Sequence, residues 1–206
     1  MVLRQKISSR KFVKRLKRRN EEKVKLSELF EKLEKSSEFK KFHNQFPKAY
    51  FCAAFFVFDY DSGEEKKQLD YYISEEEGIE TFVIADKIFQ QKAQMIEKEK
   101  LKEIKKSEIK IDLPEVLDIT KKAAEKQNFK PAKIIAVLQR LKESEQLIWN
   151  ITAFSGFTIL RMHIAMDKKL LLNEKKSMMD LMKIEKGSGK HQSIGPTNKD
   201  SADYVG

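Results

Sequence analysis

Two stretches of the chain share a pattern of a strand, a glycine and a second strand, and this repetition constrains the fold strongly. The first is KQLDYYISEEEGIETFVIAD, residues 67–86, and the second is EQLIWNITAFSGFTILRMHIAMD, residues 145–167. Apolar and polar residues alternate on both sides of Gly78 and of Ser155-Gly156, which is the periodicity of half-buried antiparallel strands. The sequence therefore predicts two β-hairpins of similar design.

The similarity extends upstream of the hairpins. The apolar runs AYFCAAFFVF, residues 49–58, and AKIIAVLQRL, residues 132–141, each follow a phenylalanine and a proline and are preceded by apolar residues at helical spacing. Within the hairpins, Leu69, Tyr71 and Ile73 correspond to Leu147, Trp149 and Ile151, and Tyr71 and Trp149 are expected to occupy equivalent inward positions. Such an internal repeat indicates a repeated supersecondary unit. The expected fold is α+β, with two tandem units, each a helix and a three-stranded antiparallel sheet.

The remaining segments lie between and around these units. The stretch between the units has few apolar positions and many Glu and Lys residues at helical spacing, which predicts a long connecting helix. Four of the seven glycines lie in the polar C-terminal stretch, which predicts disorder there. The expected boundaries are 1–25 for a basic helical arm, 26–86 for the first unit, 87–110 for the connecting helix, 111–172 for the second unit, 173–185 for a short helix and 186–206 for a disordered tail.

The first strand is apolar on both of its faces. Phe51 and Phe55 fall on one face, and Phe56 and Phe58 fall on the other. A sheet covered by one layer of helices should alternate apolar and polar residues, so a second cover is needed. The connecting helix, the sheet of the other unit and a second subunit are candidates, and we expect the two units to pack against each other.

The positive charge is concentrated at the N-terminus. Residues 1–27 contain eleven basic residues and two acids, a net charge of +9 out of +10 for the whole chain. The rest of the chain is nearly neutral, which indicates anchoring by the arm and not a basic groove across the fold. The candidate nucleic-acid-binding residues are Arg4, Lys6, Arg10, Lys11, Lys14, Arg15, Lys17, Arg18 and Arg19.

Three roles fit such an arm. It can contact the phosphates of RNA or DNA, where release of counterions drives binding, or it can be a solvated helix that keeps the protein soluble. These two interpretations have equal weight. Contact with an anionic membrane surface ranks third, because Phe12, Val13 and Leu16 form only a thin apolar stripe. The arm also resembles an organellar transit peptide, but only loosely.

The sequence also bears on the compartment. No apolar run reaches the roughly 18–20 residues of a membrane span, and the N-terminus lacks the apolar core of a secretory signal. The single cysteine, Cys52, excludes an intrachain disulfide framework and fits a reducing compartment. We therefore expect a cytoplasmic protein with no transmembrane segment.

The chain offers few groups for catalysis. The three histidines lack the spacing of a metal site, and Cys52 lies in an apolar run. Arg161 and His163 share a strand face near Asp167, but a histidine held by hydrogen bonds is a more common arrangement than a catalytic cluster. We therefore expect no enzyme activity, no catalytic or metal-binding residues and no cofactor.

Several segments of the second unit resemble the PepSY family. They are ITKKAAEK, the strand AKIIAVLQ, Trp149-Asn150-Ile151 in the next strand, and MHIAMD ending at Asp167. The resemblance implies a PepSY- or cystatin-like helix laid on a three-stranded antiparallel sheet, and an inhibitory or protein-binding role. In the family an Asp and a short turn with glycine typically follow the last strand, whereas this chain continues MDKKLLL.

Two classes of function follow. The first is a non-enzymatic binding protein whose arm tethers the body to RNA, DNA or a ribonucleoprotein. The alternative is a PepSY-like inhibitor or sensor that binds proteins or peptides, with the arm only a solubilising or membrane-surface element. In both classes the second apolar face of the sheet is a candidate surface for a protein partner or for self-association.

Overall fold

The described part of the chain contains three α-helices, a short 3-10 helix and eight β-strands. The computed structural model describes residues 24–93, 101–177 and 179. The helices are α2 (Leu26–Lys35), α3 (Ser37–Gln45), η1 (Lys106–Glu108) and α4 (Leu113–Lys126). The strands are β1 (Tyr50–Asp59), β2 (Glu65–Ile73), β3 (Gly78–Ile84), β4 (Ile88–Ala93), β5 (Lys133–Arg140), β6 (Leu147–Ser155), β7 (Thr158–Ala165) and β8 (Leu170–Ser177).

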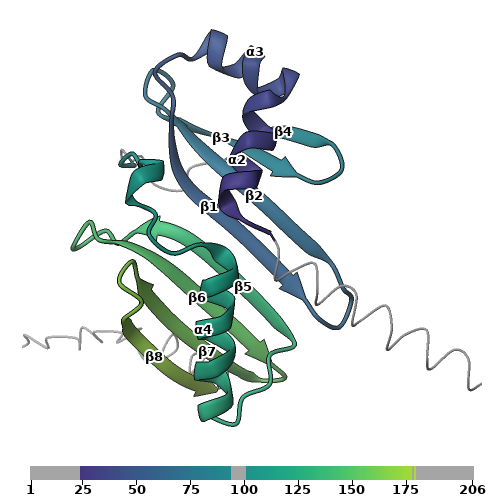
Figure 1. Cartoon of the computed structure of the whole chain (residues 1–206), viewed down its shortest axis with the longest axis vertical. Helices are drawn as coiled ribbons and strands as arrows, with labels where there is room; N and C mark the ends of the chain where they lie inside the picture. Colours follow the sequence, from purple (N-terminus) through teal and green to yellow (C-terminus); the bar gives the residue numbers. More distant parts are fainter. Residues whose placement is uncertain (1–23, 94–100, 178, 180–206) are drawn as a thin grey trace, which may run out of the picture.

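All eight strands form one antiparallel sheet in the order β4-β3-β2-β1-β5-β6-β7-β8 (Figure 1). Strands β1 and β5 pair with each other, from Ala54 opposite Leu138 to Asp59 opposite Lys133. The prediction of two tandem three-stranded units is therefore wrong, because both halves share a single sheet. The physical reason is that a strand at a sheet edge leaves N–H and C=O groups unpaired, and pairing β1 with β5 satisfies these groups in both halves.

Each half of the sheet also has a fourth strand that the sequence pattern did not indicate. Strand β4 pairs with β3, and β8 pairs with β7, so these two strands form the edges of the sheet. The connecting helix expected over 87–110 is wrong, because 88–93 form β4 and, among residues 101–110, 106–108 alone are helical. The short helix expected over 173–185 is wrong for residues 173–177, because these residues belong to β8. Most of its remainder and the whole tail, 186–206, lie outside the described residues.

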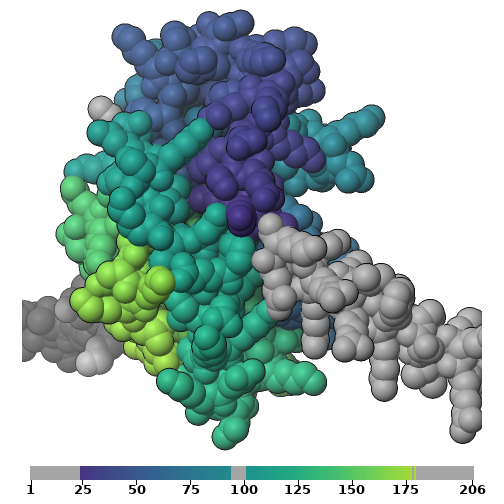
Figure 2. All heavy atoms as spheres, viewed as in Figure 1, coloured from purple at the N-terminus to yellow at the C-terminus, as the bar shows by residue number. Residues whose placement is uncertain are grey.

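The helices lie on one face of the sheet (Figure 1), and Figure 2 shows α2 beside α4 and the segment that precedes it. The buried side chains of α2 are Leu26, Leu29, Phe30 and Leu33, and those of α4 are Leu113, Val116, Leu117, Thr120, Ala123 and Ala124. Their spacing of three and four residues puts each set on one side of its helix, toward sheet residues such as Phe56 and Trp149. One core thus extends under both halves. None of the described helices is long and apolar enough to cross a membrane.

The two hairpins turn differently, although the sequence predicted similar designs. Gly156 and Phe157 form a two-residue turn between β6 and β7, with a φ of +55° at Gly156. The turn between β2 and β3 has four residues, and its left-handed position is Glu77, with a φ of 47°. Gly78 is instead the first residue of β3, opposite Ile73, so it does not have the role of Gly156.

Candidate functional site

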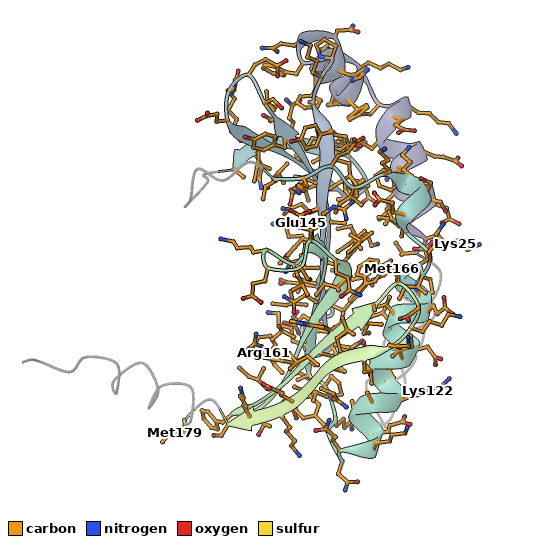
Figure 3. The ribbon with its side chains drawn as sticks, turned by 90° about the vertical axis from the view of Figure 1, so that its left-hand side faces the viewer. Lys25, Lys122, Glu145, Arg161, Met166 and Met179 are labelled. Carbon is orange, nitrogen blue, oxygen red and sulfur yellow. The ribbon has the colours of Figure 1, made fainter. Side chains whose placement is uncertain are left out.

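The sheet face opposite the helices is the candidate binding surface. In Figure 3 the helices lie on one side of the sheet and Arg161 on the other, and no helix within residues 24–93 or 101–177 covers that other side. We call this surface the open face, and its residues include Ala53, Phe55, Val57, Asp59, Lys66, Gln68, Asp70, Val83, Lys133, Ile135, Val137, Asn150, Thr152, Phe154, Ile159, Arg161, His163, Leu172, Glu174 and Lys176. Most of them are half-buried. The expectation that the two units cover each other's second face is wrong, because they lie edge to edge.

A row of directly opposed residues crosses the centre of the open face. Phe55 on β1 is opposite Gln68 on β2 and Val137 on β5. The row continues through Asn150 on β6 and His163 on β7. An apolar and aromatic centre is thus flanked by amide and imidazole groups, which both donate and accept hydrogen bonds.

Cations lie around this centre, toward the β1–β2 turn. They are Lys66, Lys133, Arg161 and Lys176. The Nζ of Lys66 lies 5.6 Å from the centroid of the Phe55 ring, in a cation–π contact. Lys133 and Lys176 each pair with an acidic neighbour, with N–O distances of 3.3 and 2.7 Å. Because these pairs are partly exposed, they contribute little to stability.

Asp70 is a half-buried acid of the open face. Its Oδ1 accepts hydrogen bonds from Oγ1 of Thr81 at 2.7 Å and from Nε2 of Gln68 at 2.8 Å. The Sγ of Cys52 donates to its backbone carbonyl at 3.3 Å. Burial raises the pKa of the Asp70 carboxyl, although the bonds from Thr81 and Gln68 act in the opposite direction. Burial also raises the pKa of the Cys52 thiol, which keeps it protonated and unreactive.

We expect Asp70→Asn to raise the melting temperature at neutral pH. The folded-state pKa of Asp70 lies above its unfolded value, so the carboxyl favours folding least when it is ionised and most when it is protonated. Asn is neutral at every pH and can still accept from Thr81 and Gln68. The gain should therefore vanish below the ordinary pKa of Asp and grow as the pH rises through the folded-state pKa.

Thermal unfolding of both proteins across this pH range checks the prediction. Asp118→Asn, an exposed change on α4, is the matched control and should give no comparable pH-dependent gain. A lower melting temperature for Asp70→Asn at neutral pH would contradict the prediction, because it would mean that the ionised carboxylate stabilises the fold.

The structure does not assemble Arg161, His163 and Asp167 into a catalytic cluster. Asp167 lies in the turn before β8, where its carboxylate is 2.8 Å from Nζ of Lys169. Burial, and then the charge of Arg161, lower the pKa of His163, so its imidazole is uncharged at neutral pH. His163 is therefore a neutral hydrogen-bonding group of the open face.

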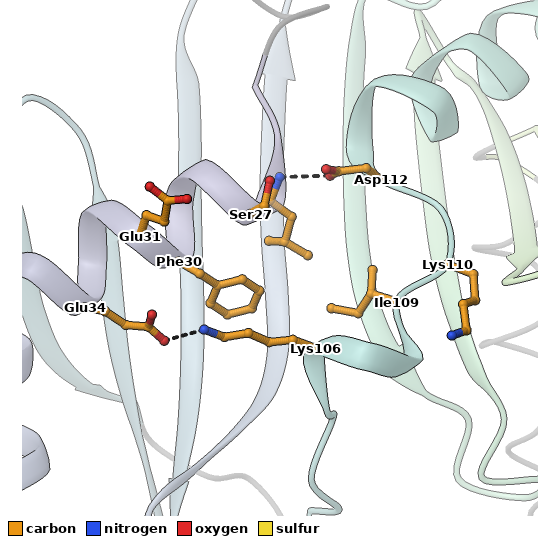
Figure 4. Close-up of a pocket in the computed structure, with 9 residues that line it drawn as sticks. Ser27, Phe30, Glu31, Glu34, Lys106, Ile109, Lys110 and Asp112 are labelled. Carbon is orange, nitrogen blue, oxygen red and sulfur yellow. Dashed lines mark hydrogen bonds and ion pairs between the residues drawn. The ribbon is translucent and has the colours of Figure 1, made fainter.

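A groove of about 350 Å³ lies between α2 and the segment 106–112 (Figure 4). Lys106 forms an ion pair with Glu34, and its Nζ lies 4.7 Å from the centroid of the Phe30 ring. These contacts join α2 to the segment that leads into α4. Since Lys106, the cation of the groove, already binds Glu34 and Phe30, we interpret the groove as a junction between the two halves.

Asp112 reinforces this junction from the other end of the groove (Figure 4). Its Oδ1 accepts from the backbone N–H of Leu113 at 2.7 Å, at the start of α4. The same oxygen accepts from the backbone N–H of Leu26 at 2.8 Å, at the start of α2. One carboxylate thus binds the N-termini of two helices, where N–H groups lack intrahelical partners and the helix dipoles favour negative charge.

Arg140 fixes the segment before α4 to β5. Its Nη2 donates to both carboxylate oxygens of Glu108 at 2.8 Å and to the backbone oxygen of Glu103 at 3.0 Å. The hydrogen bond from Arg140 holds the pKa of Glu108 below its ordinary value. Arg140 also lines a hollow of about 680 Å³ with Tyr50 and Glu145. The hydroxyl of Tyr50 donates to the backbone oxygen of Leu101, and Arg140 donates to Glu108, so both groups already have partners within the protein.

The predicted site and the observed candidate surface do not overlap. All nine basic residues proposed from the sequence, Arg4 to Arg19, lie outside the described residues. The cations of the open face were missed, because Lys66 and Lys133 are far apart in the sequence and meet only through the pairing of β2, β1 and β5. The available signal was the alternation that puts Lys66, Gln68 and Asp70 on the opposite face from Leu69 and Tyr71.

Comparisons with known proteins do not assign a family. No protein-family model matches the chain, and no curated protein matches it. Among solved structures, the chain is similar to a candidate lipoprotein from Clostridium difficile 630, with 11% sequence identity and a TM-score of 0.44. That match covers 68% of this chain and 90% of the other, and a likeness of this degree carries no functional argument.

Proposed function

We propose that the protein is a non-enzymatic nucleic-acid-binding protein. The observation that carries the proposal is the open face, which combines an aromatic and amide centre with four cations and three acids, Asp59, Asp70 and Glu174, and so keeps a small excess of positive charge. Nucleic acids offer complementary groups, since their phosphates bind cations and the faces of their bases stack on aromatic rings. The body and the basic arm would then act on the same ligand.

The charge distribution suggests different roles for the arm and for the open face in binding nucleic acid. Residues 1–27 carry a net charge of +9, whereas the whole chain carries +10. The arm therefore supplies most of the electrostatic attraction, which is long-ranged, independent of sequence and weakened by salt. The open face adds short-range contacts that do not depend on net charge.

We expect deletion of residues 1–22 to abolish binding of a generic RNA or DNA probe at moderate salt. The deletion removes the nine basic residues from Arg4 to Arg19. For the full chain, the logarithm of the affinity should fall with the logarithm of the salt concentration, with a slope of about −0.9 per neutralised phosphate on duplex DNA. Fluorescence anisotropy across a salt series measures both quantities.

The melting temperature of the truncated protein is the control, and it should match that of the full chain. Binding that survives the deletion unchanged would show that the arm is not the main phosphate contact. A full chain with no affinity for RNA or DNA at low salt would reject the proposed function.

A protein partner is the second candidate, and one observation favours it. Strands β1 and β5 place Ala53, Val57, Ile135 and Val137 side by side on the open face, and all four are half-buried. Such an apolar strip also suits a PepSY-like protein-binding role. Purified protein that carries no nucleic acid, judged by its ultraviolet absorbance before and after a high-salt wash, would favour this candidate.

A further inference from the structure

We infer that the open face binds single-stranded nucleic acid, with bases stacked on Phe55 and Phe154 and phosphates held by Lys66 and Arg161. The inference rests on the proposed function and names the form of nucleic acid that the sheet can accept. Both phenylalanines are half-buried, so each ring is held by its neighbours and keeps part of its surface accessible. In the free protein Nζ of Lys66 lies over the Phe55 ring, so a base that stacks there would displace the lysine toward a phosphate. Base–aromatic stacking of this kind tolerates any base sequence.

The strand registers define a path across the face. Phe55 is opposite Val137 on β5, and Phe154 is opposite Lys133 on the same strand. With strands about 4.8 Å apart and a rise of about 3.3 Å per residue, the two phenylalanines are separated by roughly 16 Å along the sheet. One base cannot contact both rings, so the path requires a strand of several nucleotides.

The cations flank this path. Lys66 on β2 is opposite Val57 on β1, which is opposite Ile135 on β5. The same row continues through Thr152 to Arg161 on β7 and ends at Glu174 on β8, so a phosphate would compete with this carboxylate for Arg161. The line from Phe55 to Phe154 crosses this row near Ile135, so Lys66 lies on one side of the path and Arg161 on the other. Stacked bases would then direct the sugar–phosphate backbone toward either cation.

A duplex does not fit this arrangement. Its base faces are stacked on one another, and its major groove admits a helix or a two-stranded ribbon, which is much narrower than an eight-stranded sheet. A single strand presents both the base faces and the phosphates that the surface can bind.

The test uses the full chain and labelled probes: a short oligouridylate, the matching oligothymidylate and a mixed-sequence duplex. Phe55→Leu and Phe154→Leu keep an apolar side chain and remove the aromatic face, so each should weaken single-strand binding about tenfold. The matched control is Phe157→Leu, because Phe157 is 80% exposed in the β6–β7 turn and lies outside the path. Lys66→Gln and Arg161→Gln should each make the salt dependence shallower, by about 0.7 in slope on a single strand.

Each outcome has a definite meaning. Weaker single-strand binding by both leucine variants, with the control unchanged and melting temperatures retained, supports the inference, and a comparison of the two oligonucleotides tells RNA from DNA. If the full chain binds but none of the four variants changes the affinity or the salt slope, the arm acts alone and the inference is overturned while the proposed function stands. Preference for the duplex, or dimerisation that buries the face in sedimentation experiments, also overturns it. No binding to any probe at low salt rejects the proposed function itself.

Discussion

Trp149→Ala should lower the free energy of unfolding by about 3–5 kcal/mol, as expected for a fully buried aromatic residue. The side chain is completely buried beneath the helix layer. Its ring lies 5.9 Å from that of Phe56, and its Nε1–H donates to the backbone oxygen of Ile111 at 3.2 Å. Truncation removes the apolar contacts and leaves that carbonyl without its donor, so two separate losses combine. Chemical denaturation followed by circular dichroism measures the effect.

Phe157→Ala provides the comparison for this prediction. Phe157 is 80% exposed and belongs to the turn between β6 and β7, so its removal creates no cavity. Its unfolding free energy should stay within about 0.5 kcal/mol of the unchanged protein. A Trp149→Ala variant as stable as Phe157→Ala would be incompatible with the packing described above.

Asp112→Ala is expected to cost about 2–4 kcal/mol, more than an ordinary helix cap. Loss of a single cap costs about 0.5–2 kcal/mol, and a buried N–H left without an acceptor costs about 1–3 kcal/mol. Both apply here, because the same Oδ1 accepts from Leu113 in α4 and from the buried Leu26 in α2. The variant should also loosen the contact between the two halves.

Hydrogen exchange and denaturant unfolding together check this expectation. Asp118→Ala is the control, because Asp118 lies on the solvent side of α4 and pairs with the exposed Lys122. The hydrogen-exchange rate of the Leu26 amide should rise in Asp112→Ala and stay the same in Asp118→Ala. Equal stability of the two variants would mean that Asp112 does not couple the helices.

The sequence indicated the strands whose side chains strictly alternate. Tyr71 and Trp149, expected to point inward from the period of two, are both buried in the core. Local alternation is visible in a sequence because each strand must place one face on the core, whatever its neighbours are. The pairing of β1 with β5 is a long-range choice that no local pattern encodes, so the arrangement of the two halves was predicted wrongly.

The edge strands were missed for a related reason. Strand β4 contributes Ile88 to the core margin but leaves Phe89 57% exposed, and three of its other four residues are polar. An edge strand buries few side chains, so its sequence shows little alternation of apolar and polar residues. The Lys and Glu residues that follow β4 are also typical of an exposed helix, which favoured the wrong prediction. The candidate surface was missed in the same way, because its cations come from strands that are distant in the sequence.

The joining of β1 to β5 has a consequence for synthesis on the ribosome. The chain emerges from its N-terminus, so β1 to β4 are complete before residues 133–138 exist. Until then the outer edge of β1 offers the unpaired backbone of Ala54 to Asp59 to any nascent chain nearby, and edges of this kind promote misassembly. Translation that stalls between β4 and β5 would prolong this exposure, so slow codons in that interval should increase aggregation of the nascent protein.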